Sequence, residues 1–334
     1  MNDFKTIEAV FEAYNHLKVL IIGDVMVDSY ISGLVERISP EAPVPVVFVT
    51  SKEDRLGGAA NVALNIRAMG ATPILCTVIG QDFKGEKFLE LMKEKNISTE
   101  GILRSGKRRT TVKTRVLGNN HQMLRIDEEN EDEITNDERE LLVNRVKSLI
   151  ETDGINVIIF EDYDKGIISE QLIDEVVAIA NSHKIPIAVD PKKKNFNAYK
   201  SVTLFKPNLK ELKEGLKIEV DKNNKESLTK AAAFLHDERN IGLVMITLSE
   251  AGVFMSKNDF SNVFPAHIRN IVDVSGAGDT VISVAALSLA LGLSPTMIGT
   301  ISNLSGGLVC EKAGVVPIDK KQLLEEAKQM NLKL

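Results

Sequence analysis

The chain of 334 residues contains no tryptophan, two cysteines and five histidines. Cys76 and Cys310 lack a partner at the spacing of metal sites, so we expect two free thiols in a reducing compartment. The histidines have no ligand spacing either, and we assign them no role.

The sequence also has no excess of positive charge and no long apolar run. The net charge is -6 and the pI is about 5.6, which argues against a mainly electrostatic binder of nucleic acid. The longest apolar stretch, Val281–Leu293, is too short to span a bilayer, and residues 1–18 lack the apolar core of a signal peptide. We therefore expect a cytoplasmic protein with no nucleic-acid or membrane partner.

What the sequence does contain is a series of short apolar runs alternating with helical patterns. The expected buried strands are Lys18–Ile22, Ile74–Ile79, Val157–Phe160, Ile185–Val189, Thr203–Phe205 and Leu243–Thr247. The expected helices are Asn61–Met69, Glu86–Lys95, Asn136–Glu151, Ser169–His183 and Lys225–Glu238. This alternation predicts an α/β fold, with a central mostly parallel sheet and helices on both faces. Ligands of such folds bind beyond the C-terminal ends of the strands.

Two segments break the alternation. Residues 39–47 (SPEAPVPVV) are too rich in proline for a helix and suit edge strands. Residues 109–127 alternate around Gly118-Asn119-Asn120, which is a hairpin signal. We predict a small β-sheet lid formed by residues 29–52 and 109–127. The α/β core would then comprise residues 1–28, 53–108 and 128–334.

The strongest chemical signal is the segment Asp273–Thr280, with glycines at 276 and 278 and an apolar stretch directly after it. It predicts a glycine turn that feeds the N-terminus of a buried helix, where free backbone amides can hold an anion. Asp279 would lie among these amides and could accept a proton from an attacking hydroxyl during phosphoryl transfer. The spacing alone fits a simple N-cap aspartate equally well.

A second glycine turn, Gly57-Gly58, opens the helix that contains Asn61. Paired glycines let a ligand reach the backbone, and the Asn61 amide can bind a pair of hydroxyls; a tight turn with a helix cap is the plainer interpretation. Asp24 and Asp28 follow the first strand, where carboxylates suit the binding of sugar hydroxyls.

A third signal is Pro207–Glu211, after the strand that ends at Phe205. Asn208 and Glu211 are spaced to share one helix face. We expect them to orient water around a metal that is bound to nucleotide phosphates.

Two further glycine patterns are rejected. Gly101–Arg108 has the glycine spacing of a P-loop, but Arg108 replaces the hydroxyl residue that would hold Mg²⁺ and no buried strand feeds the segment. Gly276–Gly278 lacks the third glycine of a dinucleotide fingerprint, since position 281 is valine.

Together, Gly57–Asn61 and Asp273–Asp279 resemble the two signatures of the PfkB (ribokinase-like) carbohydrate kinases, and the resemblance covers nearly the whole chain. It implies that Asp279 is the base and that the amides of Gly276, Ala277 and Gly278 form the anion hole. It also implies a ribokinase-like fold with a β-sheet lid, the cofactors ATP and Mg²⁺, and a homodimer through the lid. A monovalent-cation requirement stays open.

Within that family the chain is most similar to the kinases of D-glycero-β-D-manno-heptose 7-phosphate. The similar segments are Gly23–Tyr30, Arg37–Val47, Gly57–Asn65, Asp162–Gly166, Asp190–Lys192 and Pro207–Glu211. The resemblance implies transfer of the γ-phosphate of ATP to the anomeric hydroxyl, giving the 1,7-bisphosphate for ADP-heptose and lipopolysaccharide core synthesis. Many relatives carry a C-terminal nucleotidyltransferase domain; no His-x-Gly-His motif precedes Leu334, so we expect the kinase alone.

The same resemblance assigns binding residues. ATP is expected at Asn208, Leu209, Lys210, Glu211, Thr247, Ser249, Gly252 and Asn303, with Glu211 holding the metal through water. The sugar phosphate is expected at Asp24, Asp28, Gly57, Gly58, Asn61, Arg115, Lys165 and Lys192. Candidates for its distal phosphate are Lys113, Arg115, Arg125, Lys165 and Lys192, because a phosphate favours Arg or Lys, although each alone also fits a surface charge. Glu161 and Lys193 depart from the pattern, which often has a small residue and a glycine there, and both could alter sugar recognition.

Other functions remain as alternatives. The acceptor could be ribose, a fructose phosphate or a nucleoside, although the 5% aromatic content disfavours nucleoside stacking. A non-catalytic regulator on the same fold is a different class, against which the intact Asp279 argues. A dehydrogenase is disfavoured by the incomplete dinucleotide fingerprint.

Overall fold

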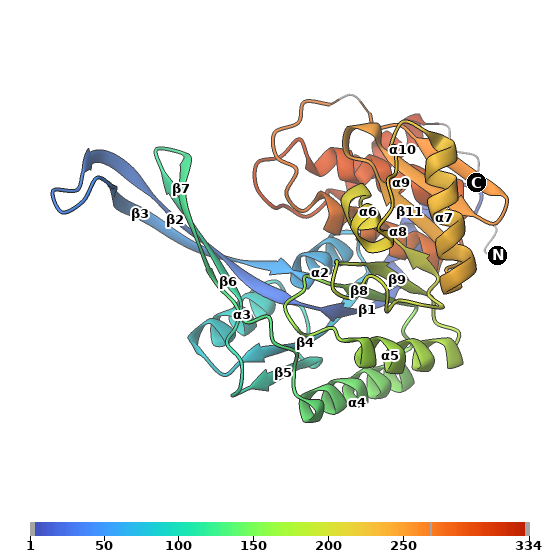
Figure 1. Cartoon of the computed structure of the whole chain (residues 1–334), viewed down its shortest axis with the longest axis horizontal. Coiled ribbons are helices and arrows are strands. Elements are labelled where there is room, and N and C mark those ends of the chain that lie inside the picture. The colour runs from blue at the N-terminus through green and yellow to red at the C-terminus, as the bar shows by residue number, and fades with distance from the viewer. Residues whose placement is uncertain (1–3, 268, 331–334) are drawn as a thin grey trace.

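The computed structural model describes residues 4–267 and 269–330, which form a core sheet of nine strands and a separate sheet of four strands (Figure 1). The core strands are β1 (Lys18–Gly23), β4 (Thr72–Gly80), β5 (Ile102–Ser105), β8 (Val157–Glu161), β9 (Ile187–Asp190), β10 (Leu204–Phe205), β11 (Leu243–Thr247), β12 (Val253–Lys257) and β13 (Phe260–Phe264). The helices are α1 (Ile7–Ala13), α2 (Ala59–Ala68), α3 (Phe83–Glu94), α4 (Asn136–Asp153), α5 (Glu170–Ser182), α6 (Leu209–Leu216), α7 (Lys225–Arg239), α8 (Ala277–Ala290), α9 (Pro295–Val309) and α10 (Lys320–Gln329).

The core sheet is mostly parallel. Its order is β13-β12-β11-β10-β9-β8-β1-β4-β5, and the strands from β11 to β5 in this order pair in parallel. Each apolar run expected to be a strand is one, which confirms the predicted fold class. The antiparallel hairpin β12–β13 at the edge was not predicted.

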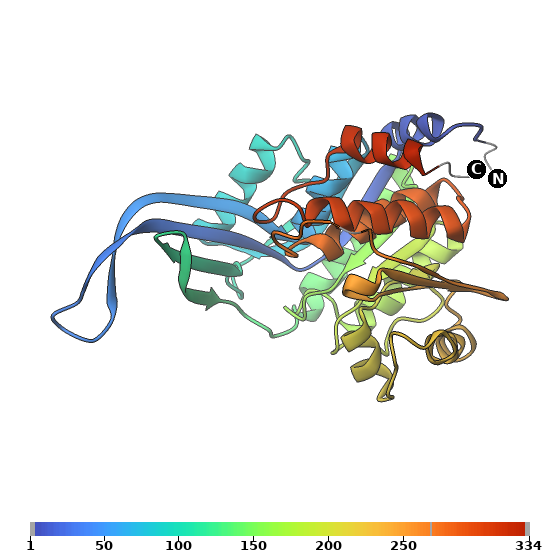
Figure 2. The ribbon, with the colours of Figure 1, turned by 90° about the horizontal axis from the view of Figure 1, so that it is seen from above.

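Helices cover both faces of this sheet, as predicted (Figures 1 and 2). Successive side chains of a strand point to opposite faces, and two buried clusters follow from this. Val19, Ile21 and Ile159 pack in the cluster that includes α2, α8 and α9. Leu20 and Ile158 pack in the cluster that includes α4, α5 and α7. Parallel strands buried on both faces explain why the runs are uniformly apolar.

Helix α8 lies in the first of these clusters and is buried along most of its length. Apart from Asp279, Thr280, Ser283 and Ser288 its residues are small or apolar on every side, as expected for a core helix rather than a surface helix. None of the helices in residues 4–267 and 269–330 has the length and apolar character needed to cross a membrane.

The second sheet has the order β3-β2-β6-β7 and projects from the core as a long arm (Figures 1 and 2). Its strands are β2 (Val25–Ile38), β3 (Pro45–Gly58), β6 (Val112–Gly118) and β7 (His121–Glu128). Asn119 and Asn120 have φ values of 51° and 66°, as the tight turn between β6 and β7 requires. The predicted lid sheet and its hairpin are therefore confirmed.

The lid and the core are joined at a glycine. Gly58 ends β3, precedes α2 and has φ 62° and ψ -138°, a conformation that a side chain would strain. A Cβ atom there would lie 2.5 Å from the backbone oxygen of Asp24. The close approach brings the lid, the end of β1 and the start of α2 to one point at the C-terminal edge of the sheet.

Candidate active site

A glycine turn opens α8 at this edge. Gly276 is the N-cap with φ 78°, and Asp279 lies in the first turn of the helix with 8% of its surface exposed. A Cβ atom on Gly276 would lie 3.1 Å from the Asn61 side-chain nitrogen, so the turn is packed directly against α2. The Ala277 amide contacts the backbone oxygen of Val274 at 3.3 Å, within the turn.

The Asp279 carboxylate is held by two donors from distant parts of the chain. The Asn61 amide donates to Asp279 Oδ2 at 2.7 Å, and the Tyr163 hydroxyl donates to Oδ1 at 2.8 Å. Burial raises the pKa of Asp279, whereas these two hydrogen bonds stabilise the ionised form and oppose the rise. The arrangement fixes a buried carboxylate whose proton affinity is greater than that of an ordinary aspartate.

An ion pair lies beneath the glycine turn. Lys206 Nζ is 2.7 Å from Asp190 Oδ2, and both side chains are buried. A Cβ atom on Gly278 would lie 3.8 Å from that oxygen and 3.9 Å from Lys206 Nζ. A buried ammonium group therefore stands next to the start of α8, where amides and helix dipole already favour negative charge.

Asn208 and Glu211 form a capping box at the start of α6. Asn208 Oδ1 accepts from the Glu211 amide at 2.9 Å, and Glu211 Oε2 accepts from the Asn208 amide at 2.8 Å. Lys192 Nζ donates to Glu211 Oε1 at 2.7 Å and lies 3.8 Å from Asp190 Oδ1. Lys192, expected in the sugar site, is thus held beside the expected nucleotide residues. Its pKa is raised by Asp190 and Glu211, which outweigh its burial.

The region around Asn208, Glu211 and Lys192 at the start of α6 can hold nucleotide phosphates and a metal ion that keeps its water ligands. Among the described residues, no three His, Cys, Asp or Glu side chains are grouped to bind a metal by themselves. Glu211 is anchored by its two partners yet keeps free lone pairs on both oxygens. The donor set therefore fits Mg²⁺ that is carried by phosphates and contacted through water.

The remaining residues expected at ATP have structural contacts here. Gly252 has φ 93° in the turn between β11 and β12, where a Cβ atom would meet the Phe264 oxygen at 2.0 Å. Asn303, in α9, donates to the Pro265 oxygen at 2.8 Å. Thr247 ends β11 and bridges to Asn208. Ser249 follows β11, and Leu209 and Lys210 are the first residues of α6. These positions gather around one end of the sheet, and their nucleotide contacts stay predictions.

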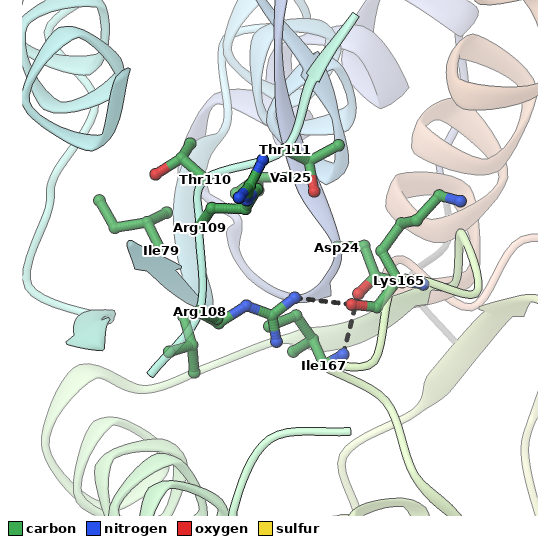
Figure 3. A pocket seen from close by; sticks show the side chains of 10 residues that line it. Asp24, Val25, Ile79, Arg108, Arg109, Thr110, Thr111, Lys165 and Ile167 are labelled. Atoms are coloured by element: carbon green, nitrogen blue, oxygen red, sulfur yellow. Dashed lines mark hydrogen bonds between the residues drawn. The ribbon is translucent and has the colours of Figure 1, made fainter. Parts of the chain in front are cut away.

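Asp24 anchors a loop (Figure 3). Its carboxylate accepts from the backbone amides of Tyr163 at 2.9 Å, Lys165 at 3.1 Å and Ile167 at 3.0 Å; Figure 3 draws the contact with Ile167. Burial raises the pKa of Asp24, and the three amides and Arg108 act against that rise. The side chain is 1% exposed, so its visible role is to hold the loop that carries Tyr163. Sugar binding by Asp24 stays a prediction.

Arg108, from the rejected P-loop pattern, lies in the same region. The pattern contains strand β5 and opens no helix, which confirms the rejection. The Arg108 guanidinium donates to the Lys165 backbone oxygen at 2.6 Å and lines a cavity of about 10 Å³ with Asp24 (Figure 3). A cavity of this size holds roughly one water molecule.

At the root of the lid, Asp28 and Tyr30 organise two arginines. Arg115 donates to Asp28 Oδ1 at 2.5 Å. The guanidinium carbons of Arg55 and Arg115 lie 4.7 Å and 5.4 Å from the centre of the Tyr30 ring. A Cβ atom on Gly57 would lie 2.2 Å from Asp28 Oδ2, so glycine there is needed for Asp28 to fit.

The other candidate cations are paired with acidic residues. Lys165 Nζ lies 2.9 Å from Glu129 and 2.6 Å from Glu131, in the acidic connector after β7. Lys113 contacts Asp127 and Glu129, and Arg125 contacts Asp127. The structure therefore brings Arg115 and Lys165 to the lid side and Lys192 to the nucleotide side.

Comparison with known proteins decides the family. The model of the pfkB family carbohydrate kinases matches residues 16–321. The chain belongs to this family. It is a carbohydrate kinase, and thus a phosphotransferase.

Curated relatives of this PfkB kinase include the Bifunctional protein HldE of Helicobacter pylori, 39% identical over 89% of the chain, and that of Geobacter sulfurreducens, 36% identical over 96%. The chain spans 64% and 65% of the lengths of these two relatives. Similar solved structures include phosphofructokinase-2 from Escherichia coli (TM-score 0.75, 17% identity, 93% of this chain and 99% of that one). Another is the Arabidopsis thaliana ribokinase complexed with ribose and ATP (TM-score 0.69, 15% identity, covering 92% of this chain and 99% of that one). At these identities the solved structures support the fold alone.

Sequence reasoning missed several residues of the candidate site. Tyr163 and Lys206 were not assigned roles, and Asn61 was expected to bind sugar rather than to contact Asp279. Arg55 lies at the lid root beside Tyr30. Asp162–Gly166 was noted as a motif, but the contact between Tyr163 and Asp279 joins positions 116 residues apart and has no local signal.

The three amide contacts of Asp24 predict a structural effect of mutation. In Asp24→Ala, three backbone donors, one buried and two partly buried, lose their acceptor at about 1–3 kcal/mol each, so the free energy of unfolding should fall by about 3 kcal/mol. Asp24→Asn keeps one oxygen and should lose less, and the exposed Asp237→Ala on α7 serves as control. Urea denaturation measures all three. A variant that keeps its stability and loses only sugar affinity would instead identify Asp24 as a sugar ligand.

Proposed function

We propose that this chain transfers the γ-phosphate of ATP to the anomeric hydroxyl of D-glycero-β-D-manno-heptose 7-phosphate, giving the 1,7-bisphosphate for ADP-heptose and lipopolysaccharide core synthesis. The observation that carries the chemistry is the Asp279 carboxylate, buried at the start of α8 and held by Asn61 and Tyr163. The choice of sugar is supported by the similarity to the HldE proteins and by the segments Arg37–Val47 and Asp162–Gly166.

In this proposal Asp279 accepts the proton of the attacking hydroxyl. Asn61 and Tyr163 each occupy one lone pair, which leaves the remaining lone pairs in a fixed direction for the acceptor. Burial raises the pKa of Asp279, which makes its ionised carboxylate a better base than that of an ordinary aspartate. The Asp279 carboxylate thus needs no change of position to receive the proton.

The chain's own groups also stabilise the transferred phosphate. The amides of Gly276, Ala277 and Gly278 would bind the phosphate at the start of α8, the Ala277 amide in place of its 3.3 Å contact with the Val274 oxygen, and Lys206 adds a buried positive charge beside Gly278. Magnesium-bound ATP, when present, supplies the phosphoryl group and neutralises part of its charge. Glu211 would hold that metal through water, and Asn208, Leu209, Lys210, Thr247, Ser249, Gly252 and Asn303 would line the nucleotide. A cytoplasmic site of action belongs to the same proposal.

We expect Asp279→Asn to fold normally and to lose turnover by about 10²–10⁴. The substitution keeps the size of the side chain, and the Tyr163 hydroxyl can rotate to accept from the new amide, so the packing should survive. Thermal unfolding and kcat from coupled ADP release are the two measurements. Turnover near that of the wild type would show that Asp279 is not the base.

Asn208→Ala and Glu211→Ala should raise the Mg²⁺ concentration required for activity and leave sugar affinity largely intact. Both substitutions also remove a helix cap, which alone costs about 1 kcal/mol. Asn224→Ala is the matched control, because Asn224 caps α7 through the amides of Glu226 and Ser227. Titration of Mg²⁺ at fixed sugar separates the effects: the assignment fails if the site variants keep the metal dependence of the Asn224 variant.

The acceptor is expected to carry a phosphate already. Arg115 and Arg55 lie over one tyrosine ring at the lid root, where two charge-assisted hydrogen bonds would contribute about 1.5–3 kcal/mol each. Heptose 7-phosphate should therefore be preferred over free heptose by roughly 10² or more in kcat/KM. Arg115→Gln should reduce that preference and leave the constant for free heptose unchanged. Equal constants for the two sugars in the wild type would contradict the heptose 7-phosphate assignment.

We also propose a homodimer that forms through the lid. Large apolar side chains are exposed on its strands. The exposed fractions are 47% for Leu34, 72% for Phe48, 55% for Leu124 and 46% for Ile126. Exposed apolar groups clustered on a projecting sheet are typical of an interface. Sedimentation equilibrium should show a dimer for the wild type and a monomer for Phe48→Glu. A monomeric wild type at micromolar concentration would exclude this assembly.

A further inference from the structure

Three neighbouring strands of the core sheet carry an ionisable residue at or directly after their C-terminal end, and these residues face α8. Ile159, Ala188 and Leu204 belong to the buried cluster on the α8 side. Because side chains alternate along a strand, Glu161, Asp190 and Lys206, each two residues further on, point to the same side. Glu161 and Asp190 are also paired in register. These three residues form the floor of the site beneath Asp279.

Glu161 differs from its neighbours in having no partner. It is completely buried, and neither of its carboxylate oxygens has a hydrogen-bond partner among the described residues. Asp190 is paired with Lys206 at 2.7 Å. The adjacent Asp162, on the opposite face, accepts from Asn195 and Tyr199. An ionised carboxylate buried without a partner is strongly disfavoured, whereas the protonated form can persist there.

We propose that Glu161 is a positioning residue that acts as an uncharged carboxylic acid in the working kinase, keeping a third negative charge away from Asp279 and from the incoming phosphoryl group. The inference rests on the proposed phosphoryl transfer by Asp279.

The groups that face Glu161 support this protonation state. Asp190 lies beside it on β9, Asp279 faces it from α8, and Lys206 and Lys192 follow β10 and β9. Burial contributes most to raising the pKa of Glu161 well above its ordinary range, followed by Asp190 and Asp279, while Lys192 and Lys206 oppose the rise. Tyr163 also faces this cluster, and burial, followed by the charge of Asp279, raises its pKa. With Glu161 neutral, the charges of Lys206 and Lys192 are offset by Asp190 and Glu211 and not by a further carboxylate.

The consequence for activity lies on the alkaline side. When Glu161 loses its proton at high pH, its charge stands beside Asp279 and repels the phosphoryl group, so kcat/KM should fall. Glu161→Gln imitates the neutral acid. It should change kcat/KM at pH 7 by less than about tenfold and lose the alkaline decline.

The consequence for stability has a definite sign. The folded protein keeps the Glu161 proton at pH values where the unfolded chain has released it, so the contribution of Glu161 to stability falls as pH rises from about 4.5 toward the folded pKa. Over that range the folding equilibrium of the wild type should weaken relative to Glu161→Gln by about tenfold per pH unit.

The experiment measures urea unfolding from pH 4 to 9 and kcat/KM from pH 6 to 9.5 for the wild type and Glu161→Gln. Glu161→Met, also uncharged and of similar length, serves as a second variant, and the exposed Glu140→Gln serves as control. We expect a stability difference that grows with pH for both Glu161 variants and is absent in the control. A difference independent of pH, or a loss of about tenfold or more in kcat/KM at pH 7 for Glu161→Gln, would overturn the proposal. Unfolding needs no substrate, so it tests Glu161 even if the sugar assignment fails.

Discussion

The contact of Asn61 and Tyr163 with Asp279 is the interaction on which the site depends. A buried carboxylate is stable as an anion only when donors surround it, and these two donors come from α2 and from the loop after β8. Asn61 is placed by the glycine turn at the lid root. Tyr163 is placed by Asp24, which binds the backbone of its loop. The orientation of the carboxylate is therefore set by the end of β1, the end of β8 and the start of α2 together.

The same constraint links the lid to the chemistry. Gly57 and Gly58 let β3 pass close to Asp28 and to the backbone of Asp24. A side chain at either glycine would push the lid away from α2 and disturb Asn61. The lid root also carries Arg55 and Arg115 over Tyr30. A sugar phosphate bound there would contact elements that are mechanically connected to Asp279, which is how binding energy at a distal phosphate can orient the reacting hydroxyl.

Much of the fold could be predicted from the sequence, because the information is local. Parallel strands buried on both faces have uniformly apolar sequences, and the Asn119-Asn120 turn indicates a hairpin. The hairpin β12–β13 was missed because β13 forms the partly exposed edge of the sheet and the apolar run of β12 is only three residues long, Val253–Met255. Asp279 and the glycines around it could be singled out, since a glycine turn before an apolar helix is a local pattern. Contacts between separate strands or helices could not be predicted. These are the contacts of Asp279 with its partners, of Lys206 with Asp190 and of Lys192 with Glu211. The hydrogen bonds between Asp24 and the loop after β8 could not be predicted either, because they also join distant parts of the chain.

The most direct test of the central claim is the identity of the product. Incubation of the protein with Mg²⁺-ATP and D-glycero-D-manno-heptose 7-phosphate, followed by ³¹P NMR, locates the new phosphate. The account predicts a second phosphorus resonance coupled to the anomeric proton, with the 7-phosphate resonance retained. A phosphate on any other hydroxyl, or no product while another sugar or sugar phosphate is converted, would contradict it.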